Sequence, residues 1–243
     1  MSTLPVETFR PPWLDDARAQ WLPREGHVEP LRVTAWMRSP VALDRDDGLR
    51  LEGALGWVAV AMTTGLPPPE AFAGQSHQAF TDVPVPIADE VIHGWRIAMA
   101  SDAVLPPVAV EVVRKRRKKT HAEALSLNKV QTTGGPWKML DIPVSAWASP
   151  VLEWFVMGDA ERLEALLREL HGLGRGRSGG LGNVEAWSVE VDERARTRWR
   201  ERPLPHHAGA TYDDARVMRR CAVRAPFWHP HARTVAACPV VGC

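Results

Sequence analysis

The residues of this 243-residue chain with the clearest chemical potential form a glycine-rich stretch, GLGRGRSGGLG, at positions 172–182. The segment Gly174–Gly179 formally matches G-x-G-x-x-G, but a dinucleotide-binding fingerprint needs a strand before it and a helix after it. Here a helical pattern precedes the glycines, a strand pattern follows them, and no Lys-Ser/Thr pair completes a P-loop. What remains is a loop whose backbone N–H groups can approach a phosphate, with Arg175 and Arg177 to neutralise it. A surface loop that needs glycine only to turn is the alternative.

A second candidate is the run RKRRKK at Arg114–Lys119, which places six cations in succession at the end of a strand pattern. His121, Lys129 and Lys138 follow it, and Trp137 offers a face on which a base could stack, a contact worth about 1–3 kcal/mol per base. The run predicts contact with RNA or DNA phosphates and a steep salt dependence of binding. The alternatives are a solvated tip or a localisation-type sequence, with Trp137 anchoring the hairpin.

Cysteine and histidine gather near the C-terminus, at Cys221, His229, His231, Cys238 and Cys243. Zinc sites usually show paired ligands two to four positions apart, and here only the two histidines are that close. Buried thiols and surface histidines are therefore the favoured interpretation. We expect neither a metal nor another cofactor.

Histidine is also the usual general base in RNA cleavage. Nothing in the sequence pairs a histidine with an orienting group, although seven more are available: His27, His77, His93, His121, His171, His206 and His207. No acidic cluster indicates a two-metal nuclease. Asp44, Asp46 and Asp47 lie in a turn and are better placed to cap a helix that begins at Leu49.

The elements that must position these residues follow from hydrophobic periodicity. Alternation predicts strands at 31–37, 91–100, 107–113, 151–157 and 183–191, whereas apolar and amphipathic patterns predict helices at 49–64 and after the N-cap Asp159. Residues 1–30 have no clear period and predict an N-terminal arm. Residues 120–142 predict a projecting hairpin or loop, and residues 192–243 a C-terminal extension.

This order predicts the α+β class. If residues 91–113 supply one core strand and an adjunct, the order is the βαββαβ of a ferredoxin-like (RRM-like) fold. The chain then divides into the arm at 1–30, a domain at 31–191 with a basic hairpin insertion at about 111–142, and the extension at 192–243.

Composition limits the class of protein. With 45% hydrophobic and 24% charged residues the chain is globular, and its net charge of +1 hides the uneven distribution of the cations. The longest uncharged apolar stretch, Ala54–Met62, has nine residues, whereas a membrane-spanning helix needs about 20. The N-terminus carries acids and prolines rather than the apolar core of a secretory signal, and three cysteines make a poor disulfide framework. Together these features favour a cytoplasmic protein.

A ferredoxin-like order, a basic insertion in mid-domain and a glycine-rich loop before the last strand resemble the RAMP superfamily of CRISPR-associated proteins. Three stretches are similar to one branch, the type IV subunit of the Cas-five group, which caps the 5′ handle of CRISPR RNA. They are LRVTAWMRSPVALDRDDGLRLEGALGW at 31–57, VLEWFVMGDAERLEALLRELHGLGRGRSGGLGNVEAWSVE at 151–190, and RPLP at 202–205 with APFWHP at 225–230.

The resemblance implies a non-catalytic, RNA-binding subunit of an RNA-guided effector complex, in which base pairing reads the sequence and protein holds the backbone. The glycine-rich loop would line the handle, and the basic hairpin would resemble the family's thumb, which separates the handle from the first guide nucleotides. The implied partners are CRISPR RNA, the backbone subunit, a large or large-like subunit, a helicase in some type IV systems, and target DNA, with no membrane. The expected RNA-binding residues are Arg114, Lys115, Arg116, Arg117, Lys118, Lys119, His121, Lys129, Trp137, Lys138, Gly174, Arg175, Gly176, Arg177, Ser178, Gly179 and Gly180.

Two other classes of function stay open at this point. The chain could be a metal-independent endoribonuclease that cuts repeat RNA, because the RAMP superfamily includes such enzymes with the same loop. No positioned Tyr/Lys/His set is evident, however, and the single tyrosine, Tyr212, lies in a polar segment. The glycine-rich loop could also bind a small anion or nucleotide in a metabolic protein, in which case the basic hairpin would be dispensable for binding.

Overall fold

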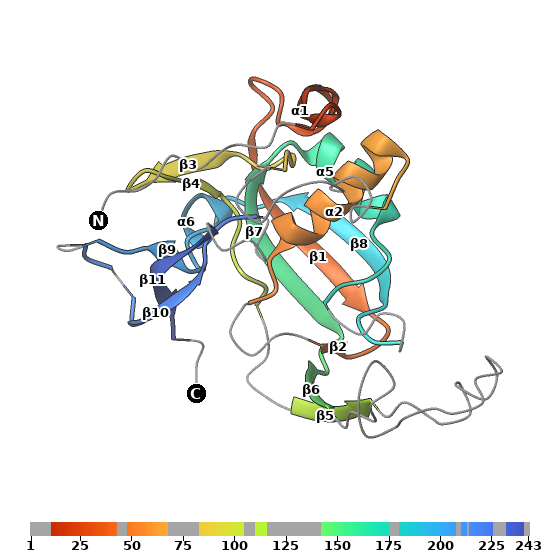
Figure 1. Ribbon diagram of the computed structural model, residues 1–243, viewed down its shortest axis with the longest axis vertical. Coiled ribbons are helices and arrows are strands. Elements are labelled where there is room, and N and C mark those ends of the chain that lie inside the picture. The colour runs from red at the N-terminus through yellow and green to blue at the C-terminus, as the bar shows by residue number, and fades with distance from the viewer. Residues whose placement is uncertain are drawn as a thin grey trace, which may run out of the picture.

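The computed structural model describes residues 11–42, 48–67, 83–104, 110–115, 142–174, 180–207, 210–212, 214–225 and 232–240, with the backbone alone at 110–115 and 142–145. Its centre is an antiparallel sheet in the order β7-β1-β8, formed by β1 (Glu29–Met37), β7 (Val151–Gly158) and β8 (Val184–Val191) (Figure 1). These are three of the strands that the alternating pattern predicted.

Two helices cover one face of this sheet, α2 (Leu51–Thr64) and α5 (Ala160–Glu169) (Figure 1). The alternate β1 residues Leu31, Val33 and Ala35 point to this side and are buried with Leu55 and Leu163 from the helices. Because successive strand side chains point to opposite faces, Arg32, Thr34 and Trp36 lie on the other face. At the start of α5, the predicted N-cap Asp159 accepts a hydrogen bond from the Arg162 N–H at 3.3 Å.

An irregular segment, rather than a regular strand, lies along the outer edge of β7. Isolated antiparallel bridges pair Ile87 with Gly158, Ala100 with Val156 and Val104 with Glu153. Between the bridges of Ile87 and Ala100, β3 (Asp89–Ile92) and β4 (Trp95–Ala98) form a hairpin, so the prediction of a single strand at 91–100 is wrong. The reason is the turn between them, where His93 and Gly94 both have positive φ, 50° and 80°, as in the tight turns that match strand twist.

A separate small sheet has the order β2-β6-β5, formed by β2 (Val41–Ala42), β6 (Ile142–Trp147) and β5 (Val110–Lys115). The strand predicted at 107–113 is thus described from residue 110 onward and extends further, to residue 115. The antiparallel pairing of β5 with β6 joins the two ends of the segment 116–141, so that segment connects a strand pair as the hairpin prediction requires. Residues 116–141 themselves lie outside the described residues.

The prediction of an arm without regular structure at 1–30 is wrong for its second half, which contains α1 (Leu14–Trp21). Leu14, Ala17 and Trp21 are buried, and their spacing of three and four residues puts them on one helical face. The Trp21 indole N–H donates to the Thr63 hydroxyl at 3.0 Å, which holds α1 against α2.

The region after residue 191 forms α6 (Ala195–Arg198), β9 (Leu204–Pro205), β10 (Arg216–Ala222) and β11 (Arg233–Pro239), with the last three in a sheet of order β10-β11-β9. Arg202 connects this region to the core: its fully buried guanidinium lies 2.7 Å from the Glu52 carboxylate of α2. It also donates to the carbonyl oxygens of Ala98 and Ala100, at 2.8 and 2.9 Å. The described part of the chain, with four helices and antiparallel sheets, confirms the α+β class. No helix within it is both long and apolar enough to cross a membrane.

Candidate nucleic-acid interface

The two ends of the glycine-rich loop are held together at a neck formed by residues 171–174 and 180–184. The Leu173 N–H donates to the Gly182 carbonyl at 2.8 Å, and the Val184 N–H donates to the His171 carbonyl at 3.1 Å. Gly182 has φ +70°, and a Cβ there would lie only 1.9 Å from the Leu173 carbonyl oxygen. Only glycine therefore fits at this position, since both the backbone conformation and the space exclude a side chain.

The neck lies directly against the chain that leaves β1. A Cβ at Gly174 would lie 2.3 Å from the Ala42 carbonyl oxygen, so the loop begins in backbone contact with β2. On the other side of the neck, the Gly182 N–H donates to the Pro40 carbonyl at 2.8 Å, and the Arg38 N–H donates to the Asn183 carbonyl at 2.9 Å. Backbone hydrogen bonds and contacts thus hold residues 38–42 along the whole neck.

Strand β2 also pairs with the basic hairpin, through β6. Val41 of β2 and Val110 of β5 both pair with Trp147 of β6, one on each side of it. The first two cations of the basic run, Arg114 and Lys115, end β5 opposite Pro143 and Ile142. The Trp147 pair and the Ile142 pair are five residue steps apart, so the run leaves the sheet about 17 Å along the hairpin from the level of β2.

The structure therefore brings the bases of the two predicted phosphate-binding segments to one small sheet, although about 60 positions separate them in the sequence. Of the predicted residues, Gly174 and Gly180 are described in full, and Arg114 and Lys115 by their backbone. The others lie outside the described residues: Arg116, Arg117, Lys118, Lys119, His121, Lys129, Trp137, Lys138, Arg175, Gly176, Arg177, Ser178 and Gly179. Their RNA-binding role stays a prediction.

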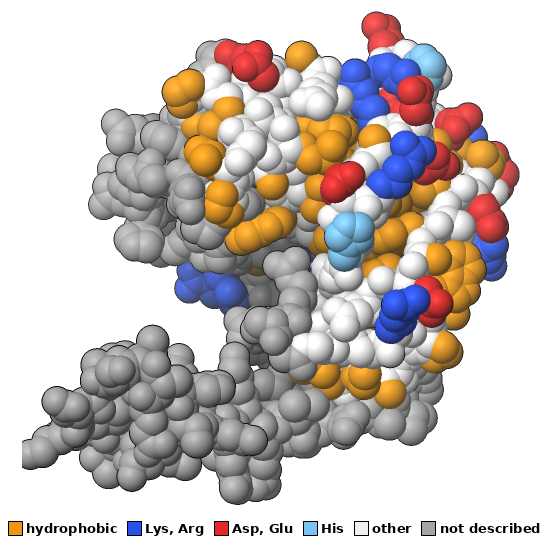
Figure 2. Space-filling model, turned by 90° about the vertical axis from the view of Figure 1, so that its right-hand side faces the viewer, with side chains coloured by type: hydrophobic (Ala, Val, Ile, Leu, Met, Phe, Trp, Pro, Cys, Tyr) orange, Lys and Arg blue, Asp and Glu red, His pale blue; other side chains and the backbone are white. Residues whose placement is uncertain are grey.

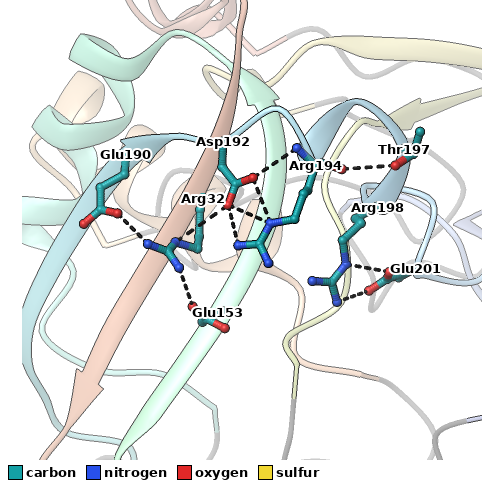
Figure 3. Close-up of polar contacts among 8 residues, drawn as sticks. All are labelled: Arg32, Glu153, Glu190, Asp192, Arg194, Thr197, Arg198 and Glu201. Atoms are coloured by element: carbon teal, nitrogen blue, oxygen red, sulfur yellow. Dashed lines mark hydrogen bonds and ion pairs between the residues drawn. The ribbon is translucent and has the colours of Figure 1, made fainter.

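On the open face of the central sheet, arginines are already engaged by carboxylates (Figure 3). Arg32 of β1 contacts Glu190 of β8 at 2.5 Å and Glu153 of β7 at 3.4 Å. Beyond the end of β8, Arg194 contacts Asp192 at 2.6 Å and lowers the pKa of that carboxyl to about 2.

The helix α6 covers this end of the open face. The Arg198 guanidinium carbon lies 3.9 Å from the centre of the Phe155 ring, and Arg198 also contacts Glu201 at 2.7 Å. Phe155 is buried together with Ala195 and Trp199. These arginines are thus paired with carboxylates, which would compete with a phosphate, and α6 covers the strand below them.

A comparison with protein families identifies the family to which the chain belongs. A family model described as CRISPR type IV associated protein Csf3 matches residues 101–239, more than half of the chain. The chain belongs to the Csf3 family. It is a Cas5-like type IV subunit, and the resemblance inferred from the sequence is confirmed. The matched range includes the β5–β6 hairpin, the glycine-loop neck and the C-terminal sheet, whereas no curated protein matches the chain.

The Csf3 fold also gathers histidines that the sequence did not pair. The rings of His93 and His207 lie 3.5 Å apart between centroids, and His206 Nδ1 lies 3.4 Å from the Tyr212 hydroxyl. Two of these residues, His93 and Tyr212, line a cavity of about 560 Å³ beside the β3–β4 hairpin, here called the histidine cavity, whose lining also includes Arg200. Desolvation, with the two neighbouring histidines, lowers the pKa of His93, and burial raises the pKa of Tyr212.

This histidine cavity is separate from the glycine-loop neck. In Figure 1 the β3–β4 hairpin lies at the upper left, whereas β2, β6 and β5 lie at the bottom. The adjacency of His206 and His207 was the one signal available in the sequence, and it did not indicate His93 or Tyr212 as partners. Among the described residues, no group of three or more histidine, cysteine or acidic side chains could hold a metal ion.

The two described cysteines of the C-terminal sheet are buried thiols, as the favoured interpretation predicted. Cys221 and Cys238 lie with their Sγ atoms 3.7 Å apart, and the Arg219 Nε–H donates to the Cys238 Sγ at 3.2 Å. The remaining candidates for a zinc site, His229, His231 and Cys243, lie outside the described residues.

Proposed function

We propose that this Csf3 family member is a non-catalytic subunit that binds the 5′ handle of CRISPR RNA in a type IV effector complex. The observation that carries the proposal is the meeting of the glycine-loop neck and the base of the basic hairpin on the β2-β6-β5 sheet. A single RNA strand can reach both segments from there. Backbone N–H groups with Arg175 and Arg177 would hold the handle phosphates, and the basic run would hold the nucleotides that follow.

We further infer that the core is ferredoxin-like. The sheet order β7-β1-β8, with residues 87–104 bridged along the outer edge of β7, supports this inference. So does the placement of α2 between β1 and that edge segment, and of α5 between β7 and β8, with both helices in the same hydrophobic core. Such a core leaves one sheet face uncovered by α2 and α5, and here α6 covers one end of that face.

In the proposed complex, base pairing reads the target while this subunit holds the RNA backbone. Its partners would be the backbone subunit, a large or large-like subunit, a helicase in some systems and target DNA. The complex would work in the cytoplasm.

The alternative of a metal-independent endoribonuclease has one supporting observation, the histidine cavity. His93 with its lowered pKa could accept a proton at neutral pH, and His206 lies beside Tyr212. The β3–β4 hairpin beside this cavity nevertheless lies away from β2, β6 and β5, from which the loop and the basic hairpin start (Figure 1). A handle held at the glycine loop would therefore not present its scissile bond there, which favours the binding role.

The experiment is a titration of the purified chain with labelled CRISPR-repeat RNA in EDTA, followed by anisotropy and then by a denaturing gel of the same samples. We expect tight, salt-sensitive binding with intact RNA. The variant R175E/R177E should lose binding. The control R168E/R196E reverses two exposed arginines on α5 and α6 and should keep it.

Two outcomes would contradict the proposal. A well-folded R175E/R177E variant that retains RNA would remove the phosphate-binding role of the loop. A single cut that disappears in H93A or Y212F would place the protein among the processing nucleases. A variant that lacks the basic hairpin tests the small-anion alternative, because a small-anion site would keep its ligand without the hairpin.

A further inference from the structure

One exposed aromatic side chain lies on the open sheet face beside the glycine-loop neck. Trp36 is the last outward-facing residue of β1 and is 40% exposed, whereas the preceding outward residue, Thr34, is buried. The residues directly opposite it on the neighbouring strands are Val151 and Ala186, which are small and uncharged. The indole therefore has an accessible surface and no facing charge in either directly paired residue.

Arg38 follows Trp36 by two residues, directly after the end of β1. Its side chain is 67% exposed and meets the Glu185 carboxylate at 3.5 Å. An exposed ion pair of that length contributes between zero and about 1 kcal/mol, so a phosphate can compete for the guanidinium. The Arg38 backbone N–H is bonded to Asn183, which places this residue at the exit of the glycine loop.

We propose that Trp36 and Arg38 form a nucleotide-binding site in which the indole stacks on a base of single-stranded RNA and the guanidinium binds the adjacent phosphate. The inference rests on the proposed function, because the RNA held by the glycine loop is the strand that would continue across this site. Trp36 and Arg38 lie outside the glycine-rich loop and the basic run, the two segments that the sequence indicated. The carboxylate network around Arg32 and the cover of α6 limit the site to the Trp36 end of the sheet face.

A protein contact at Trp36 is the competing interpretation, and a different surface has that character. Trp57 and Met62 of α2, both 43% exposed, line a groove of about 630 Å³ with Leu170. Figure 2 looks onto this side of the molecule and shows hydrophobic side chains gathered on it. That groove also reaches the neck, but its lining among the described residues carries the acidic Glu169 and no arginine, whereas Trp36 lies two residues from the exposed Arg38, which favours RNA.

The test measures the affinity of the full-length chain for a fluorescent single-stranded repeat RNA. Stacking worth about 1–3 kcal/mol corresponds to a loss of about 5- to 150-fold in affinity for W36A. W36F should restore most of it, and R38A should reduce the slope of log affinity against log salt by about 0.7. M218A, which removes a similarly exposed apolar side chain from β10 of the C-terminal sheet, is the control and should leave affinity unchanged.

The outcomes separate this inference from the proposed function. If R175E/R177E abolishes binding but W36A binds like the wild type, the handle-binding proposal stands and the Trp36 site is wrong. If W36A keeps its RNA affinity but no longer co-purifies with the other complex subunits, the residue is a protein contact and the inference is also wrong. A wild-type chain that binds no RNA overturns both. Circular dichroism of W36A verifies that the fold is intact.

Discussion

The buried ion pair between Arg202 and Glu52 is expected to be the main polar connection between the C-terminal region and the helical layer. Both side chains are excluded from solvent, and their charged atoms lie 2.7 Å apart. Arg202 also donates to the carbonyl oxygens of Ala98, Ala100 and Val223, at 2.8, 2.9 and 3.0 Å. The variant R202M would keep most of the side-chain volume but leave the Glu52 carboxylate buried without its cation.

Removing one partner of a buried ion pair costs about 3–5 kcal/mol, because the remaining charge is uncompensated. For a chain of this size each kcal/mol lowers the melting temperature by about 2–4 °C. We therefore expect R202M to melt about 6–20 °C below the wild type. The double variant E52L/R202M removes the stranded carboxylate and should be less destabilised than R202M alone, although the three carbonyl oxygens still lose their donor.

Thermal unfolding followed by circular dichroism measures these differences. The control is R196M, which removes an exposed arginine paired with the exposed Glu193 and should change stability by less than about 1 kcal/mol. A melting temperature for R202M within about 2 °C of the wild type would refute the reasoning. So would a double variant less stable than R202M, because the stranded charge would then not be the cause.

Three further predictions concern the neck, the basic run and acid stability. G182A should destabilise the fold and weaken RNA binding, because its Cβ would meet the Leu173 carbonyl. The control G26A has φ +75° and open space, so it carries only the cost of its backbone conformation, about 1–2 kcal/mol, and equal melting temperatures for the two variants would contradict this prediction. Replacing Arg114–Lys119 by glutamine should reduce the salt slope of RNA binding by about 2 if three of the six cations contact phosphate, and an unchanged slope would mean that the run is solvated. Burial alone would raise the pKa of Asp159, but hydrogen bonds from Arg24 and Arg162 lower it to about 2, and Arg194 lowers that of Asp192 to about 2. Both depressed values stabilise the fold above the usual aspartate pKa near 3.8, so stability should fall between about pH 4 and pH 2, and D159N should show a smaller fall in urea titrations.

Sequence patterns predicted the central elements well because each carries its own periodicity. Leu31, Val33 and Ala35 alternate into the core, and Leu163, Leu166 and Leu167 mark the buried face of α5. The patterns were less informative where one or two residues decide the structure. A pair of positive φ values at His93 and Gly94 divides one apparent strand into two, and α1 is too short for its three buried residues to stand out.

The candidate interface could be predicted in its parts but not in its assembly. Glycine and arginine composition indicated the loop, and charge indicated the hairpin, because both signals are local. Their meeting depends on two residues of β2, which carry no pattern of their own. The histidine cavity and the Trp36 site depend in the same way on partners that are distant in the sequence.

The break at Ser39-Pro40 explains why β2 can serve both segments. Proline lacks the N–H that a continuing strand would need, so β1 ends and the chain steps into a second, shorter strand. The free Pro40 carbonyl then accepts the Gly182 N–H, while Val41 pairs with Trp147 of the hairpin. Since the loop and the hairpin share this two-residue strand, a change that displaces β2 should weaken both RNA contacts together. A change within either segment should weaken only its own.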